Sequence, residues 1–167
     1  MQTTQTCKVA VVMGSESDLD RVQGAFQILS ELGIPFEKRI LSAHRTSDDT
    51  IAFAETAAQR GLKVLIAAAG KAAHLGGVLA SRTLLPVIGI PLSTSLSGLD
   101  ALFSTVQMPT GYPVASVAID GAANAALLAA QILALQDPQL AEKLAQRRLA
   151  MAEQARSADK RINESFS

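Results

Sequence analysis

Five short apolar segments alternate with segments of helical periodicity along most of the chain. The apolar segments are rich in aliphatic and β-branched residues and occupy 8–13, 35–41, 63–69, 85–90 and 113–119. Such nearly continuous apolar runs are typical of strands buried on both faces. Strands that alternate with helices form a parallel sheet, because each connection must cross over the sheet before the next strand begins. The sequence therefore predicts an α/β fold built on a five-stranded parallel sheet.

Residues that start or stop helices delimit the segments between the strands. Gly33 and Gly61 each follow a helical pattern and are expected to end it. Thr46 or Ser47 is expected to cap the second helix, and Ser97 the fourth. We expect helices at about 18–32, 46–60, 72–83, 97–107, 122–136 and 137–160.

The last predicted helix stands apart from the alternation. Asp137 is a suitable cap and Pro138 suits the first helical position. Leu140, Leu144 and Met151 form an apolar side that either packs on its own domain or docks on a neighbouring subunit. Beyond Arg156 the segment is polar, and we expect it to fray.

The composition narrows the class of protein. At 167 residues, 49% hydrophobic and 18% charged, the chain is expected to form one domain with a sizeable core. Fifteen basic residues balance fifteen acidic ones without a basic stripe, which argues against a nucleic-acid partner.

The longest apolar stretch, 122–135, is too short to span a membrane. Residues 1–8 lack the pattern of a secretion signal, so we expect a cytoplasmic protein. Cys7, the single cysteine, is expected to be an inert buried thiol.

Polar clusters follow four of the predicted strands. They read GSESD at 14–18, SAHR at 42–45, GKAAH at 70–74 and STSLSG at 93–98. In open parallel sheets, ligands bind beyond the carboxyl ends of the strands. The sequence therefore predicts a site at this edge, and both histidines, His44 and His74, belong to it.

The first cluster has features of an anion site without a known phosphate-loop signature. Gly14 permits a tight turn, the serines supply hydroxyls, and a helix start offers backbone N–H groups to an anion. The Walker motif and the G-x-G-x-x-G fingerprint are both missing from this cluster. Ser15 and Ser17 are equally consistent with plain turn and cap residues.

His44 and Arg45 favour proton transfer and anion binding. An imidazole titrates near neutral pH, and a guanidinium stays charged and matches a phosphate with its planar fork. Alternatively, His44 is a turn residue, Arg45 pairs with Asp48 or Asp49, and His74 serves packing or a helix end. The two histidines lie thirty residues apart with no carboxylate repeat, so the pattern predicts no metal site. A nucleophile elbow with a Ser–His–Asp order is also missing.

Six ordered motifs together resemble the N5-carboxyaminoimidazole ribonucleotide mutase family of purine biosynthesis. They are VVMGSESD, SAHRT, GKAAHLGG, PVIGIP, SGLDALFSTVQMPTGYPVASVAI and NAALLAAQIL, and they cover about residues 8–135. The resemblance implies a flavodoxin-like three-layer sandwich, assembled as a homo-octamer with sites at subunit junctions. It also implies a reaction without metal, nucleotide cofactor or ATP.

The resemblance also implies roles for individual residues. His44 matches the acid–base residue, and His74 matches a second histidine that lies near the site without carrying the proton. Ser15, Asp18 and Arg45 match contacts to the ribose and phosphate. The positions expected to line the ring and its carboxylate are Ser42, Gly70, Lys71, Ala72, His74 and Leu75.

The chain departs from the family pattern in the turn after the third predicted strand. Ala68 and Lys71 stand where the family usually has glycine, and Gly76 where it has proline. Our hypothesis is that Lys71 adds positive charge near the substrate carboxylate; alternatively, it points to solvent or a subunit seam. The segment AIDGAANAALL is also shorter than in some family members.

Two other functions remain open at this stage. One is a direct aminoimidazole ribonucleotide carboxylase that uses CO2. The other is a non-enzymatic flavodoxin-like nucleotide-binding protein. A flavin site would favour aromatic rings around the cofactor, and the chain has no Trp and a single Tyr, Tyr112.

Overall fold

The structure is a computed structural model that describes residues 7–165. Its centre is a five-stranded parallel sheet with strand order β2-β1-β3-β4-β5. The strands are β1 (Val9–Met13), β2 (Phe36–Ile40), β3 (Val64–Gly70), β4 (Val87–Leu92) and β5 (Ala115–Ser116). This order is that of the flavodoxin-like fold, so the prediction of an α/β parallel sheet is confirmed. The order of connection reverses between β1 and β3.

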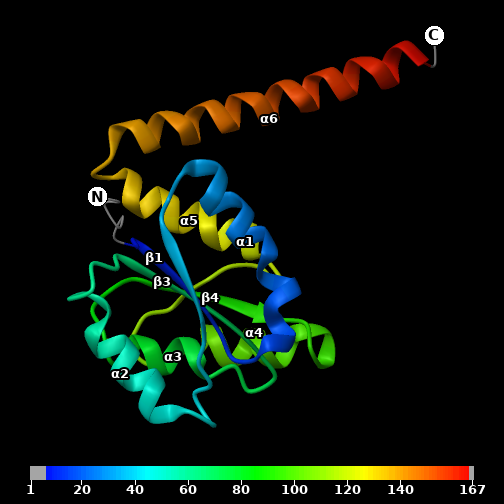
Figure 1. The fold of residues 1–167 in the computed structure, drawn as a ribbon. Coiled ribbons are helices and arrows are strands. Elements are labelled where there is room, and N and C mark those ends of the chain that lie inside the picture. The colour runs from blue at the N-terminus through cyan, green and yellow to red at the C-terminus, as the bar shows by residue number, and fades with distance from the viewer. Residues whose placement is uncertain (1–6, 166–167) are drawn as a thin grey trace.

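The sheet is covered on both faces by helices (Figure 1). One face carries α1 (Leu19–Leu32) and α5 (Ala122–Ala134); the other carries α2 (Ser47–Ala57), α3 (Leu75–Ala80) and α4 (Leu99–Val106). Short 3-10 turns, η1 (Glu16–Asp18) and η2 (Leu96–Gly98), precede α1 and α4. The final helix, α6 (Pro138–Ser165), follows α5.

Side chains of the central strands alternate between two cores. Val9, Val11 and Met13 of β1 face α1 and α5, whereas Ala10 and Val12 face α2 and α3. All five are at most 1% exposed. Because both faces are covered, both sets of positions must be apolar, which explains the nearly continuous apolar runs in the sequence.

Several predicted helix ends are confirmed and one is wrong. Gly33 has φ 71° and ends α1 with two backbone bonds, Gly33 N to Ser30 O and Ile34 N to Leu29 O. Pro138 is the first residue of α6, and Asp137 Oδ1 accepts from Leu140 N. Ser97 does not cap the fourth helix: it lies in a left-handed conformation inside η2, and Gly98 precedes α4.

The fifth strand is much shorter than the predicted range 113–119. Only Ala115 and Ser116 pair with β4. β5 is an edge strand with a single neighbour, and Pro91 of β4 has no N–H with which to continue the ladder. The carbonyl of Pro91 accepts instead from Asp120 N, where the chain already turns towards α5.

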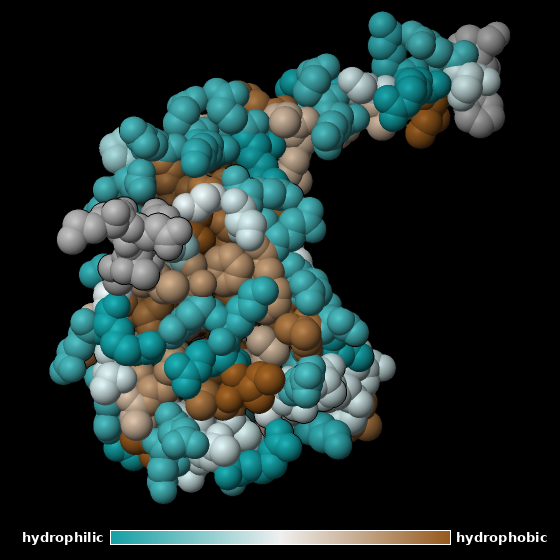
Figure 2. All heavy atoms as spheres, in the orientation of Figure 1, coloured by the Kyte–Doolittle hydropathy of each residue, from teal (hydrophilic) through white to brown (hydrophobic). Residues whose placement is uncertain are grey.

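Helix α6 is longer than predicted and extends away from the body of the molecule (Figure 1). The expectation of fraying after Arg156 is wrong, because the helix continues to Ser165. Good helix formers occupy the segment, and an i,i+4 pair of Lys160 with Glu164 supports its end. None of the described residues from 148 onwards is buried. Figure 2 shows this part as a mostly hydrophilic rod with scattered hydrophobic side chains.

Two smaller expectations concern Cys7 and the membrane. Cys7 is a free thiol that is half-buried ahead of β1, so full burial is not confirmed. Among the helices within residues 7–165, none combines the length and apolarity needed to cross a membrane.

Candidate active site

A pocket of about 700 Å³ opens at the carboxyl edge of the sheet. It is lined by the end of β3 and by the segments that follow β1, β2, β3 and β4. The lining residues are 14, 15, 17, 18, 42–45, 69–72, 74, 75 and 94. This is the edge at which the sequence predicts a site, beside the reversal of strand order between β1 and β3. Its volume lies within the range usual for small-molecule sites, about 300–1,000 Å³.

The turn after β1 supplies a hydroxyl and a buried carboxylate. Ser15 Oγ accepts from Ser17 N at 3.4 Å and from Ser17 Oγ at 2.9 Å, so Ser15 caps η1 and also lines the pocket. Asp18 is only 7% exposed. Burial raises the pKa of the Asp18 carboxyl, while the Ser15 backbone bond and the charges of Arg21 and Arg45 oppose that rise.

Arg45 joins the loops after β1 and β2. Its Nη2 donates to Gly14 O at 2.7 Å and its Nε to Ser42 Oγ at 3.4 Å, while its backbone N bonds the same hydroxyl. No ion pair with Asp48 or Asp49 is found among the described residues, so that alternative is not supported. A guanidinium has five N–H donors, so further donors remain for a ligand.

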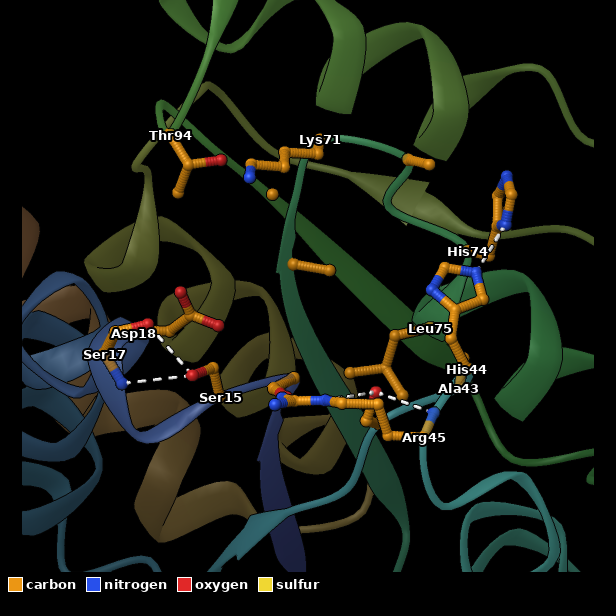
Figure 3. Close-up of a pocket in the computed structure, with 15 residues that line it drawn as sticks. Ser15, Ser17, Asp18, Ala43, His44, Arg45, Lys71, His74, Leu75 and Thr94 are labelled. Atoms are coloured by element: carbon orange, nitrogen blue, oxygen red, sulfur yellow. Dashed lines mark hydrogen bonds between the residues drawn. The ribbon is translucent and has the colours of Figure 1, made fainter.

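The two histidines contact each other across the pocket wall. His44 Nε2 lies 3.0 Å from His74 Nδ1, and the rings meet edge to face with centroids 5.1 Å apart. Because His74 engages Nε2, the nitrogen that His44 can offer to a ligand is Nδ1. Figure 3 shows that nitrogen turned towards the open part of the pocket.

The turn after β3 brings the backbone close to the pocket. Gly70 lies against Thr94, and a Cβ at residue 70 would overlap the Thr94 side chain. Lys71 follows with φ 55°, a left-handed conformation that residues with a side chain rarely adopt. His74 N bonds Ala72 O at 2.8 Å, and Leu75, only 2% exposed, begins α3.

All ten site residues predicted from the sequence lie on this one pocket. They are Ser15, Asp18, Ser42, His44, Arg45, Gly70, Lys71, Ala72, His74 and Leu75. Their individual roles stay predictions. The pocket also includes five residues outside that set: Gly14, Ser17, Ala43, Ala69 and Thr94. Four of them belong to the polar clusters expected at this edge, and Ala69, near the end of β3, does not. Within the described residues, no group of three or more His, Cys, Asp or Glu side chains is placed to hold a metal.

Comparison with known proteins identifies relatives over most of the chain. The AIR carboxylase family model matches residues 8–154. The chain is 50% identical over 157 residues to a Pyrococcus horikoshii protein, covering 93% of this chain and 89% of the relative. It is 54% identical over 143 residues to a Bacillus subtilis protein, covering 84% of this chain and 88% of the relative. Both relatives are named N5-carboxyaminoimidazole ribonucleotide mutase.

A solved structure agrees with the sequence matches. The crystal structure of Treponema denticola PurE superposes with a TM-score of 0.82 at 30% identity, covering 92% of this chain and 96% of that one. The flavodoxin-like sheet and the sequence matches lead to one assignment: this chain belongs to the AIR carboxylase family.

Proposed function

We propose that this protein is an N5-carboxyaminoimidazole ribonucleotide mutase of purine biosynthesis, with residues 8–135 as the core of a single catalytic domain. The substrate carries a carboxyl on an exocyclic nitrogen, and the product carries it on a ring carbon. Relatives at 50–54% identity have this name. The observation that carries the proposal is His44, held at one ring nitrogen by His74 and facing the pocket with the other.

The reaction needs one group that both gives and takes a proton. The bond from the exocyclic nitrogen to the carboxyl breaks, CO2 leaves, and protonated His44 donates to that nitrogen. The ring carbon then uses its electron pair to bond CO2, and neutral His44 removes the proton from the same carbon. The proton gained by nitrogen equals the one lost by carbon, so no co-reactant is required. A general acid–base residue contributes about 10²–10⁴-fold to a rate.

The remaining pocket residues position the substrate. Ser15, Asp18 and Arg45 hold the ribose and phosphate, because they offer hydroxyl, carboxylate and guanidinium groups on one side of the pocket. Ser42, the 70–74 turn and Leu75 line the ring and its carboxylate. His74 orients the His44 ring through the 3.0 Å contact.

Small residues keep the reactive end of the pocket compact. Ala43, Ala69 and Ala72 join Gly70 in the lining. Their short side chains let backbone approach the ring and leave little room for bulk water. Released CO2 is then held against its target carbon, and position replaces concentration.

A conversion assay tests this function. The parent protein is given N5-carboxyaminoimidazole ribonucleotide without ATP or added metal, and formation of the ring-carboxylated product is followed. We expect turnover by the parent and a loss of about 10²–10⁴-fold in kcat for His44→Asn. Equal rates for the two proteins would show that His44 is not the proton carrier.

Direct carboxylation of aminoimidazole ribonucleotide is the second candidate, because the matching family model is described as AIR carboxylase. This activity takes CO2 from solution rather than from the substrate's own nitrogen. Supplying aminoimidazole ribonucleotide with bicarbonate separates the two. Faster product formation from that mixture than from the N5-carboxylated substrate would favour the carboxylase.

We also propose that the working form is a homo-octamer. Helix α6 projects from the body and exposes Leu149 and Ile162 by 62% and 61%. Helix α4 and the turn before it expose a second apolar stripe, formed by Leu96, Leu99, Phe103 and Val106. Copies of the same chain would bury these surfaces. Sedimentation velocity tests the proposal, and a monomer at micromolar concentration would contradict it.

A further inference from the structure

Asp18 presents a buried carboxylate to the pocket. It is only 7% exposed, and Figure 3 shows its carboxylate turned towards the open part of the pocket. Among the described residues it takes part in no ion pair, and although it directly precedes α1, its side chain makes no capping bond. Burying such a group costs free energy unless it finds a partner. The carboxylate is therefore available to a ligand.

Arg21 is placed to pair with Asp18 but is bound elsewhere. Residues three positions apart are neighbours on the surface of a helix. Burial raises the pKa of Asp18, and the charge of Arg21 is among the causes that oppose this rise, so the two groups lie near each other. Arg21 Nη1 nevertheless donates to Asp120 Oδ2, at 2.9 Å, 99 residues further along the chain. Two carboxylates thus compete for one guanidinium, and Asp120 holds it.

The backbone fixes the position of Asp120 independently of Arg21. Asp120 has φ 54°, and its N donates to Pro91 O at 2.9 Å. Its Oδ1 accepts from Ser93 N at 3.1 Å, in the turn that carries Thr94 into the pocket. With Oδ1 engaged by the backbone, Oδ2 is the atom that remains for Arg21. The carboxylate of Asp120 is therefore held ready for the guanidinium.

We propose that Asp120 is a positioning residue that keeps Arg21 away from Asp18 and so leaves the Asp18 carboxylate free for the ligand. The inference rests on the proposed function, in which Asp18 helps to hold the ribose and phosphate. Without the charge of Asp120, Arg21 turns to the other carboxylate, and the ligand has to break that ion pair before it binds. Proton transfer at His44 involves none of these three groups, so the effect falls on binding rather than on the chemical step.

Asp120→Asn separates the charge from the structure of the turn. Asparagine tolerates the left-handed conformation and keeps an oxygen for Ser93 N, but its amide NH2 cannot accept from Arg21. The double variant Asp120→Asn/Arg21→Gln also removes the guanidinium that would turn to Asp18. Glu31→Gln is the matched control, because it makes the same acid-to-amide change in another half-exposed ion pair of α1, with Arg147 at 2.8 Å.

Calorimetry with ribose 5-phosphate and with the ring-carboxylated ribonucleotide measures affinity, and the conversion assay gives KM and kcat. We expect Asp120→Asn to weaken both ligands and to raise KM by about 3- to 5-fold, the effect of a half-exposed ion pair that the ligand must break. The kcat should stay at the parental value. The double variant should recover most of the lost affinity, which a purely structural role of Asp120 would not allow. Glu31→Gln should bind both ligands like the parent.

Three results would overturn the proposal. The first is parental affinity in Asp120→Asn, and the second is a fall in kcat at unchanged KM. The third is a loss of affinity that removal of Arg21 does not restore, which would make Asp120 a structural residue of its turn. Circular dichroism and thermal unfolding check that each variant is folded.

The same measurements distinguish this inference from the proposed function. A parent protein that binds both ligands, with the expected loss and recovery in the variants, but does not convert the N5-carboxylated substrate would reject the function and leave the inference standing. A parent protein that turns over, with parental KM in Asp120→Asn, would reject the inference alone. A parent protein that binds neither ligand would reject both.

Discussion

The two edges of the sheet make their left-handed turns with different residues. At the amino edge, the positions with positive φ before β2, β3 and β5 are Gly33, Gly61 and Gly111. At the carboxyl edge they are Lys71 after β3, Leu96, Ser97 and Gly98 after β4, and Asp120 after β5. Glycine adopts this conformation freely, whereas a residue with a Cβ pays about 1–2 kcal/mol.

This difference separates structural turns from functional ones. An amino-edge turn only has to reverse the chain, so glycine is sufficient. At the carboxyl edge, Lys71 lines the pocket and Asp120 fixes the turn that carries Thr94. Conformational strain persists where the surrounding structure over-determines it, and such positions cluster at functional sites. We therefore expect added side chains to destabilise the glycine turns of the amino edge, and glycine to stabilise the strained non-glycine turns of the carboxyl edge. We expect ligand binding to change only at positions that line the pocket or position a residue that does.

The largest effect on stability is expected for Gly70→Ala at the carboxyl edge. The new Cβ would overlap the Thr94 side chain, and overpacking of this kind costs about 1–3 kcal/mol. Urea unfolding measures the change in the free energy of unfolding. The double variant Gly70→Ala/Thr94→Ala lacks the overlapping Oγ1 and Cγ2 atoms and should recover most of the loss. If the double variant is as unstable as Gly70→Ala, the destabilisation does not arise from overlap with the Thr94 side chain.

The next largest effect on stability is expected at the amino edge. Gly33→Ala should destabilise the protein by about 1 kcal/mol, because φ 71° is unfavourable for alanine and the Cβ meets only the end of Lys143, at 3.6 Å. The variant should bind ribose 5-phosphate like the parent, since Gly33 lies at the opposite edge from the pocket. Thermal unfolding and calorimetry measure the two quantities. A change in affinity without a change in stability would break the distinction between the edges.

The amino-edge turns illustrate what the sequence could predict. Gly33 follows an apolar pattern of helical period, and that local signal is enough to place the end of α1. The central strands were predictable for a similar reason, because burial on both faces demands continuous apolar residues. The pocket residues followed from their places after the strands, since parallel strands bring these loops to one edge.

The carboxyl-edge turns show where local signals fail. Leu96 and Ser97 are not residues that favour a left-handed conformation, so the pattern predicted Ser97 as an ordinary helix cap. Their conformation depends on tertiary contacts, such as the packing of Gly98 against Ile119 and the bond from Ser93 N to Asp120. The short β5 likewise depends on its edge position and on Pro91 in the neighbouring strand.

A smaller effect, of opposite sign, is expected for Ser97→Gly. Glycine removes the cost of φ 54° and also gains freedom in the unfolded chain, so we expect a net stabilisation of about 0.5 kcal/mol. Because Ser97 is exposed and does not line the pocket, ligand affinity should stay unchanged. Urea unfolding of Ser97→Gly and of Gly33→Ala measures the change in the free energy of unfolding at each edge, which should be an increase for Ser97→Gly and a decrease for Gly33→Ala. A destabilised Ser97→Gly would mean that its backbone conformation is not strained.

The smallest effect on stability concerns a buried charge at the same carboxyl edge. Burial raises the pKa of Asp18 in the folded protein above its value of 3.8 in the unfolded chain. Protonation therefore favours the folded state: this contribution is fully present below pH 3.8 and is lost as pH rises through the folded pKa. Asp18→Asn, which stays neutral, should be more stable than the parent at pH 7 and lose that advantage below about pH 4. Unfolding free energies measured from pH 3 to 8 test the sign. If this more stable variant no longer binds ribose 5-phosphate, the Asp18 carboxylate is needed for ligand binding although it lowers stability. The left-handed backbone of Lys71 would be a second such cost in stability at the same pocket.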